Sequence, residues 1–331
     1  MIIFKPDYFD QFRCIAGSCP DSCCKEWEVQ VDKASAEYYR SLPGTLGNRL
    51  REVLRDEDGM TLMTIIDGRC PMWRTDGLCR IQAELGEAAL CDTCRDFPRL
   101  KHDYGDFIEY ALELSCPEAA RYILNPDAHK MLRTETPQPG EAGYDEAAME
   151  SLLHSRQQAL TLLSPDSTEI GRTLAQLLLY GCQAQSDLDC GETAEFDPSA
   201  ALEAAADLAK PADFLPALDF FLELELLTPQ WETLLRNPSP TDWESRHLAL
   251  ARYLVERYWL QAVSDYDLYS RVKMIVIACL LAKTLGGDIL HTAQLFSKEI
   301  ENNADNVDAL LDAAYAHPAF TDDKLLFLLL E

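Results

Sequence analysis

The stretch CIAGSCPDSCC, residues 14–24, carries four cysteines within eleven positions: Cys14, Cys19, Cys23 and Cys24. Five more follow in the first part of the chain, at Cys70, Cys79, Cys91, Cys94 and Cys116. Thiols at this density usually form disulfides or bind metals, and the two roles belong to different compartments. The cysteines therefore bear on both the fold of the N-terminal region and its location.

The compartment is predicted from the first residues and from the apolar runs. The start, MIIFKPDYFDQF (1–12), has no basic segment, long apolar stretch or small-residue cleavage site, so we expect no signal peptide. The apolar run MIVIACLLA (274–282) is too short to span a bilayer. We therefore expect a cytoplasmic protein, in which free thiols favour a soft metal over disulfides.

All nine early cysteines are candidate metal ligands. Cys91 and Cys94 form a CxxC pair, the spacing that most readily brings two sulfurs to one metal. Sites made only of thiolates suit zinc and iron–sulfur clusters alike. Nine thiols exceed what one four-ligand centre needs, and spacing alone does not divide them between sites. A closed zinc site that only stabilises the fold is the simpler alternative.

The three later cysteines are expected to be inert. Cys279 lies in a very apolar segment and is predicted to be part of the core. Cys182 and Cys190 are expected to flank an acidic, polar loop.

The chain is predicted to have two domains. The segment 136–144 is rich in proline and glycine and has no apolar period, which is typical of a linker. It separates a cysteine-rich metal-binding domain, residues 1–135, from an acidic all-helical domain, residues 145–331. The expected fold is mainly α, with a small, mixed and irregular α+β domain at the N-terminus and no Rossmann-like fold.

Apolar periodicity predicts the individual elements. In the first domain we expect strands at 27–32, 60–67 and 107–114, and helices at 33–42 and 47–57. In the second, the apolar spacing of three and four predicts helices at 145–163, 168–184, 197–210, 240–263, 267–287, 286–303, 304–317 and 321–330. Asp145 is expected to cap the first of these helices.

Charge excludes two classes of partner. The net charge is −27, and residues 141–331 carry 32 Asp and Glu against 12 Lys and Arg, a charge of −20. Binding to nucleic acid or to an anionic membrane needs a basic surface, so neither is expected. The acidity fits simple solubility or a lysine-bearing partner.

Motifs of common enzymes are missing. The sequence has no G-x-G-x-x-G, Walker loop, HExxH or G-x-S-x-G. A doubly wound methyltransferase or dehydrogenase usually shows a glycine-rich loop after its first strand, so that fold is not expected.

Four segments resemble one family: residues 4–32, 69–81, 90–99 and 112–124. They are similar to the flagellin lysine-N-methylases, often called FliB, and to cysteine-cluster proteins described as zinc- or iron-chelating domains. The resemblance covers roughly the first 125 residues. It implies methyl transfer from S-adenosylmethionine to lysine side chains of flagellin, or of another lysine-bearing protein, with a cysteine-bound [4Fe–4S] cluster.

The resemblance leaves the chemistry partly open. It selects no catalytic residue and no S-adenosylmethionine-binding residue. The cluster could be structural, could anchor S-adenosylmethionine, or could support radical chemistry, although the usual C-x3-C-x2-C signature is absent. Two alternatives without catalysis are a zinc- or iron-binding redox sensor and a structural interaction module.

Overall fold

A computed structural model describes residues 1–27, 29–127, 129–137 and 140–331. The fold is mainly α, as predicted, and it contains two small sheets. Within these residues, β1 with β6 is the only pair of parallel strands, so the described chain has no doubly wound sheet.

The first small unit contains most of the cysteine-rich segment. A three-stranded sheet in the order β2-β4-β3 packs with two helices, and its elements are β2 (Val29–Val31), α1 (Lys33–Ser41), α2 (Gly44–Val53), β3 (Leu54–Glu57) and β4 (Met60–Met63). Val29 and Val31 are buried while Gln30 between them is exposed, which is the alternation of a half-buried strand. The short helices α3 (Arg80–Leu85) and α4 (Asp92–Asp96) complete the unit.

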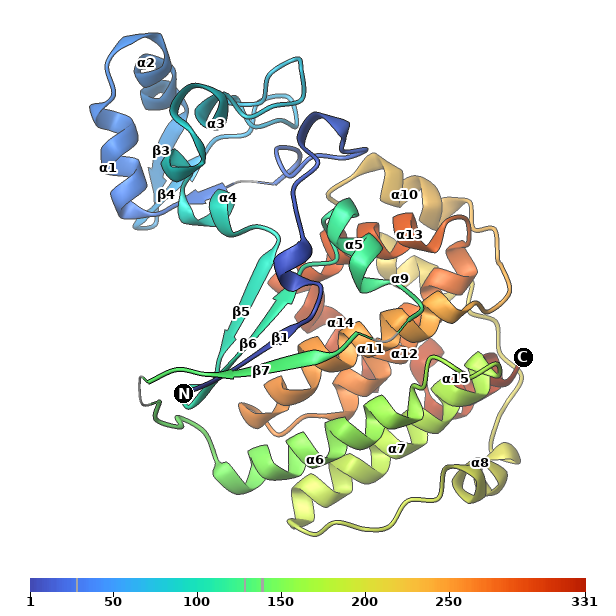
Figure 1. The fold of residues 1–331 in the computed structure, drawn as a ribbon. Coiled ribbons are helices and arrows are strands. Elements are labelled where there is room, and N and C mark those ends of the chain that lie inside the picture. The colour runs from blue at the N-terminus through green and yellow to red at the C-terminus, as the bar shows by residue number, and fades with distance from the viewer. Residues whose placement is uncertain (28, 128, 138–139) are drawn as a thin grey trace.

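The second sheet joins distant parts of the first 135 residues. Its strands are β1 (Ile2–Pro6), β5 (Arg99–Asp103), β6 (Phe107–Leu112) and β7 (Met131–Glu135), in the order β5-β6-β1-β7. Between the small unit and the helices, this sheet runs down one side of the molecule (Figure 1). The helix α5 (Pro117–Ile123) connects β6 to β7.

The remaining chain forms a helical body. Its helices are α6 (Glu146–Leu162), α7 (Ile170–Cys190), α8 (Pro198–Ala206), α9 (Ala217–Glu223), α10 (Pro229–Arg236), α11 (Ser245–Tyr258), α12 (Tyr269–Leu285), α13 (Ile289–Phe296), α14 (Ala304–Ala316) and α15 (Asp322–Leu330). Asp145 caps α6 by accepting from the amides of Ala147 and Ala148, as predicted. α12 ends at Gly286, whose φ of +67° an L side chain rarely adopts.

Two buried clusters hold the fold together. The smaller one joins α1, α2 and the three-stranded sheet, and it includes Cys70 and Cys91. The larger one contains the helices together with Phe12, Phe107 and Leu114. The four-stranded sheet therefore shares its core with the helical body, and this core extends to both sides of residues 136–144.

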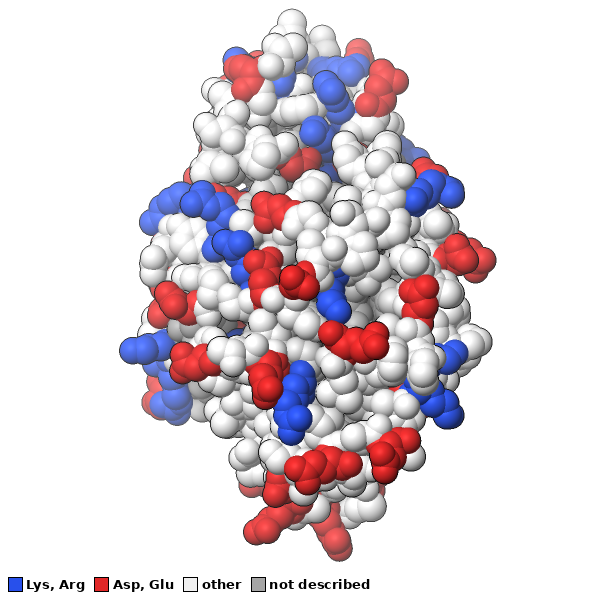
Figure 2. All heavy atoms as spheres, turned by 90° about the vertical axis from the view of Figure 1, so that its right-hand side faces the viewer, with Lys and Arg blue, Asp and Glu red and all other residues white. Residues whose placement is uncertain are grey.

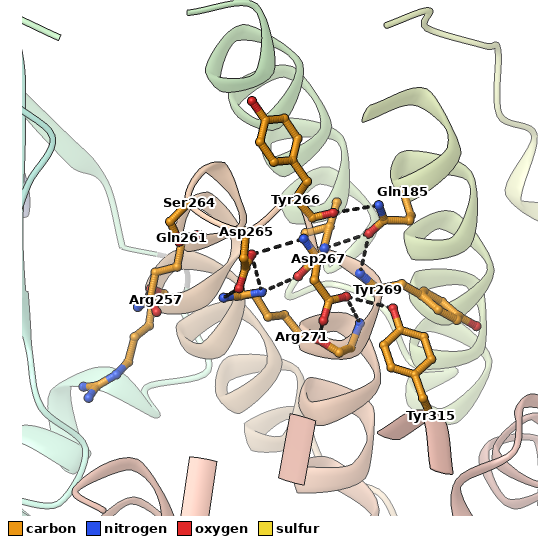
Figure 3. A network of polar contacts seen from close by, with 12 residues as sticks. Gln185, Arg257, Gln261, Ser264, Asp265, Tyr266, Asp267, Tyr269, Arg271 and Tyr315 are labelled. Carbon is orange, nitrogen blue, oxygen red and sulfur yellow. Dashed lines mark hydrogen bonds and ion pairs between the residues drawn. The ribbon is translucent and has the colours of Figure 1, made fainter. Parts of the chain in front are cut away.

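A polar network fixes the turn before α12 (Figure 3). The guanidinium of Arg271 pairs with Asp265, and the hydroxyl of Tyr315 donates to Asp267. Gln185 of α7 accepts from the amides of Leu268 and Tyr269. These bonds satisfy backbone donors at the start of α12 and tie α7, α12 and α14 together.

Several elements differ from the predictions. The helix expected at 47–57 ends at Val53, and residues 54–57 form β3 because they pair with β4. Cys182 and Cys190 both lie on α7 and do not flank a loop, since the helix continues to Cys190 and ends at Gly191. Part of the predicted linker, residues 138–139, and residue 28 of the first predicted strand lie outside the described residues. The division into two domains at 136–144 stays a prediction.

Acidic side chains are spread over the surface, and at the lower end of the view in Figure 2 the charged side chains are acidic. Among the described residues, none of the helices is long and apolar enough to cross a membrane.

Candidate metal centre

The early cysteines lie at the ends of short elements. Cys79 and Cys91 occupy the N-cap positions of α3 and α4, and Cys116 occupies that of α5. Cys94 lies three residues after Cys91 on the same helical turn. The local backbone is also folded tightly, because the amide of Cys70 donates to the carbonyl of Cys24 over 2.8 Å. Segments far apart in sequence therefore present their thiols to one another.

Six thiols form one interacting group, here called the six-thiol group: Cys23, Cys24, Cys70, Cys79, Cys91 and Cys94. The thiol of Cys24 hydrogen-bonds with both Cys23 and Cys70, which lowers the pKa of these two and raises that of Cys24. A hydrogen bond between Cys91 and Cys94 lowers the pKa of Cys91 and raises that of Cys94.

The pairs within this group are close enough to affect one another. Burial raises the pKa of Cys79, and the charges of Cys70 and Cys23 raise it further. The charges of Cys23 and Cys70 also raise the pKa of Cys94. The structure thus brings together thiols from three separate segments of the sequence.

The other three early cysteines form a second group, here called the three-thiol group: Cys14, Cys19 and Cys116. Burial raises the pKa of Cys116 to about 12, and the charges of Cys19 and Cys14 also raise it. The two groups meet at Cys19. Burial is the main cause that raises the pKa of Cys19, and the charges of Cys14 and Cys23 raise it further. This arrangement divides the nine thiols, which spacing in the sequence left undivided.

The six-thiol group fits a thiolate-bound metal by its donor chemistry. Two of its members, Cys70 and Cys91, are buried in the smaller core. In the described chain, no three Cys, His, Asp or Glu side chains are placed to hold a single metal ion. A four-iron cluster takes one thiolate on each iron, so its sulfurs stand farther apart than those around one zinc. The donor set, which consists of thiols only, fits zinc and an iron–sulfur cluster alike.

The later cysteines are separate from both groups. Cys279 is fully buried in α12, as predicted for a core residue. Cys182 and Cys190 are exposed on α7.

Asp32 positions the helix that carries the CxxC pair. One carboxylate oxygen caps α1 by accepting from the amide of Ser35 over 2.9 Å, and the other accepts from the amide of Asp92 over 3.0 Å. The bond from Ser35, followed by the bond from Asp92, lowers the pKa of Asp32 to about 2. The carboxylate therefore joins the start of α1 to the start of α4.

Asp32→Ala is expected to destabilise the protein by about 1 kcal/mol, the usual cost of losing an N-cap. Because the folded-state pKa is lowered, the stabilisation is complete above pH about 4 and is lost as the pH falls toward about 2. Urea unfolding of both proteins at several pH values measures this. Asp308→Ala, which removes an exposed carboxylate on α14, is the control, and equal stability of the two variants would contradict the role of Asp32.

A buried lysine connects the cysteine-rich loop to the helical body. The side chain of Lys298 is 1% exposed, and its Nζ lies 3.0 Å from Asp21 Oδ2 and 2.6 Å from Glu26 Oε2. The ammonium also lies 5.1 Å from the ring centroid of Trp27. Burial tends to raise the pKa of Asp21, but the charge and hydrogen bond of Lys298 outweigh it and lower this pKa.

The backbone around Lys298 explains how it reaches the loop. Residues Ser297–Glu301 form a π-helical turn that follows α13. Such turns are frequent at functional sites and change the direction of successive side chains. Lys298 faces the cysteine-rich loop, while Glu299 accepts from the amides of Leu227 and Thr228. A cavity of about 360 Å³ opens beside this junction, with Lys25, Arg121 and His291 in its wall.

No sequence motif singles out Lys298 or its partners. The segment SKEIE (297–301) was assigned to a helix, where charged residues are usually on the solvent side. This segment has two acidic residues and one lysine next to the apolar run of α13. That pattern does not distinguish a buried ion pair from charged residues on a solvent-exposed face.

Comparisons with known proteins find sequence similarity over part of the chain. Two proteins named lysine-N-methylase, from Salmonella typhimurium and Salmonella choleraesuis, are each 34% identical over 137 residues, which cover 38% of this chain and 33% of each relative. The flagellar biosynthetic protein FliU of Salmonella muenchen is 34% identical over 134 residues, which cover 38% of this chain and 79% of FliU. No family model and no solved structure matches the chain.

The matched segment covers different shares of the relatives. The chain matches about a third of the length of the two curated lysine-N-methylases, but most of FliU. The chain belongs to the FliB-like family, whose curated relatives are named lysine-N-methylase and flagellar biosynthetic protein FliU.

Proposed function

We propose that this protein N-methylates lysine side chains of flagellin, with S-adenosylmethionine as the methyl donor. The observation that carries the proposal is the 34% identity to proteins named lysine-N-methylase. In this reaction the neutral amine nitrogen attacks the methyl carbon. The carbon–sulfur bond breaks with its electron pair going to sulfur, and the amine proton goes to a base.

The six-thiol group would hold a [4Fe–4S] cluster in this proposal, with four of its sulfurs as ligands. The support is the donor set, which consists of thiols only and interacts across three segments. Such a cluster would supply an iron that can bind a ligand or carry charge at this edge of the protein. The chain's own residues hold the loop in place through Asp21, Glu26 and Lys298.

The acidic surface supports a lysine-bearing protein as substrate. Residues 141–331 carry a net charge of −20 from 32 acidic and 12 basic residues. Complementary charge mainly accelerates association, and salt screens it over about 8 Å at physiological ionic strength. Methylation is therefore expected to slow as salt is added, and methylation that is independent of salt would remove the electrostatic part of the proposal.

Mass spectrometry of flagellin tests the reaction itself. Flagellin from cells with the intact protein is expected to carry lysines heavier by about 14 Da per methyl group. The added mass should disappear when the protein is deleted and return when the intact chain is restored. Unchanged flagellin masses would contradict the proposal and would favour the alternative of a metal-binding protein without catalysis.

A further inference from the structure

A cavity of about 270 Å³ lies between the four-stranded sheet and the helices α6 and α11. Aromatic rings of Phe4, Tyr8 and Tyr110 form one wall, and the aliphatic side chain of Leu160 forms part of the other. Met131 and Leu153 also line the cavity and are each 39% exposed, so they mark its opening to the surface. The shape suits a long, mostly aliphatic side chain that enters from outside.

The charged groups around the cavity are mostly paired. Arg156 forms two hydrogen bonds, of 2.8 and 2.6 Å, with the carboxylate of Glu109. Arg257 extends away from the network before α12 (Figure 3) and lies 3.0 Å from the buried carboxylate of Glu301. Both arginines are therefore neutralised by partners of opposite charge.

Glu256 is the remaining carboxylate in the wall. Its Oε1 lies 3.0 Å from Nε2 of His129. Two carboxylates, Glu109 and Glu256, line the cavity together with Arg156 and Arg257, and Arg257 pairs with a carboxylate outside this lining. Glu256 is therefore the carboxylate of the wall without an arginine partner among the described contacts, and it favours a cation beside it over an anion.

One polar atom in the wall has no partner. Nε2 of His102 is buried and makes no hydrogen bond in the described structure. Burial lowers the pKa of His102, and Arg257 and Arg156 lower it further against the opposing effect of Glu109. His102 is therefore neutral at pH 7, and the tautomer with its proton on Nδ1 leaves Nε2 as an acceptor. A buried, unsatisfied acceptor costs free energy unless a ligand completes it.

We propose that this cavity binds a primary amine on an aliphatic chain, with Glu256 facing the ammonium and His102 Nε2 accepting one of its hydrogen bonds. The inference rests on the proposed function, because a lysine side chain is such an amine. The aromatic wall adds cation–π attraction for the ammonium and apolar contact for the methylene groups.

The test uses n-butylamine, which reproduces the end of a lysine side chain. Its binding to the full chain is followed by the NMR signal of the His102 ring, assigned with His102→Asn. Butylamine is expected to shift this signal saturably, whereas n-butyrate is not. Glu256→Gln is expected to weaken binding by about tenfold, the loss of one charge-assisted hydrogen bond. No shift with butylamine, or an equal shift with butyrate, would overturn the proposal.

Two further variants guard against effects of misfolding. Leu153→Trp fills the opening from a partly exposed position and is expected to abolish the shift while the rest of the NMR spectrum stays native. Glu203→Gln, an exposed residue on α8, is the matched control for Glu256→Gln and is expected to bind as the unaltered protein does. Wild-type affinity in Leu153→Trp would place the amine elsewhere and contradict the proposal.

The outcome also separates this inference from the proposed function. A protein that binds butylamine in the cavity but methylates no lysine would overturn the proposed function alone. Lysine methylation by Leu153→Trp at the unaltered rate would overturn the cavity assignment and leave the proposed function intact.

Discussion

If the six-thiol group holds the proposed cluster, protein carrying Cys70→Ser or Cys91→Ser is expected to purify without the iron and sulfide that this cluster brings to the intact chain. After anaerobic reconstitution the intact chain should hold about four of each, as one four-iron cluster requires. Both thiols belong to the six-thiol group and are buried in the smaller core. A serine hydroxyl there is a poor ligand for a soft metal and leaves a polar group among apolar side chains.

The controls come from the rest of the thiols. Cys182→Ser and Cys190→Ser alter exposed residues on α7 and are expected to keep the full iron content. Cys14→Ser, in the three-thiol group, is expected to retain most of it. Iron and labile-sulfide assays measure the content. Equal iron in Cys70→Ser and Cys182→Ser would contradict the assignment, and zinc without labile sulfide in the intact chain would replace the cluster with a zinc site.

Lys298→Met is expected to destabilise the protein by about 3 kcal/mol. The ammonium is nearly inaccessible and pairs with both Asp21 and Glu26, whose side chains are 22% and 20% exposed. Without the lysine, two carboxylates repel each other at a desolvated junction. Urea unfolding gives the free-energy difference, and limited proteolysis of the 14–27 loop shows whether the junction has opened.

Two comparisons isolate the electrostatic cause. Lys210→Met breaks a 2.7 Å ion pair with Asp323, but that lysine is 72% exposed, so the expected loss is within about 0.5 kcal/mol. Adding Asp21→Asn and Glu26→Gln to Lys298→Met removes the unpaired charges and is expected to restore much of the stability. If Lys298→Met and Lys210→Met were equally stable, the junction would not depend on this lysine.

Local signals explain which elements could be predicted. The strand that contains Val29 and Val31 follows from alternation, and the helix after Asp145 follows from its cap and apolar period. The strand β3 was not predicted, because residues 54–57 are mostly exposed and are held only by pairing with β4. The strand β1 was missed for a similar reason, since both of its partners lie more than a hundred residues away.

The residues of the candidate sites could also be predicted only where the sequence carries a local signal. The nine early cysteines stood out in the sequence because thiols are chemically distinctive, but spacing did not divide them. His102 and Glu256 carry no such signal, since a single histidine or glutamate reads as an ordinary polar residue until its surroundings are known. Their partial burial and their place in one cavity wall come from segments that pack together across the sheet and α11.

The sequence by itself determined the mainly helical fold, the cap at Asp145 and the concentration of thiols before residue 117. These features depend on backbone preferences and on neighbours within about one helical turn. The tertiary structure decided the division of the thiols, the burial of Lys298 and the cavity at His102. Each of these depends on the environment that distant segments create, because desolvation and pairing act through space and not along the chain.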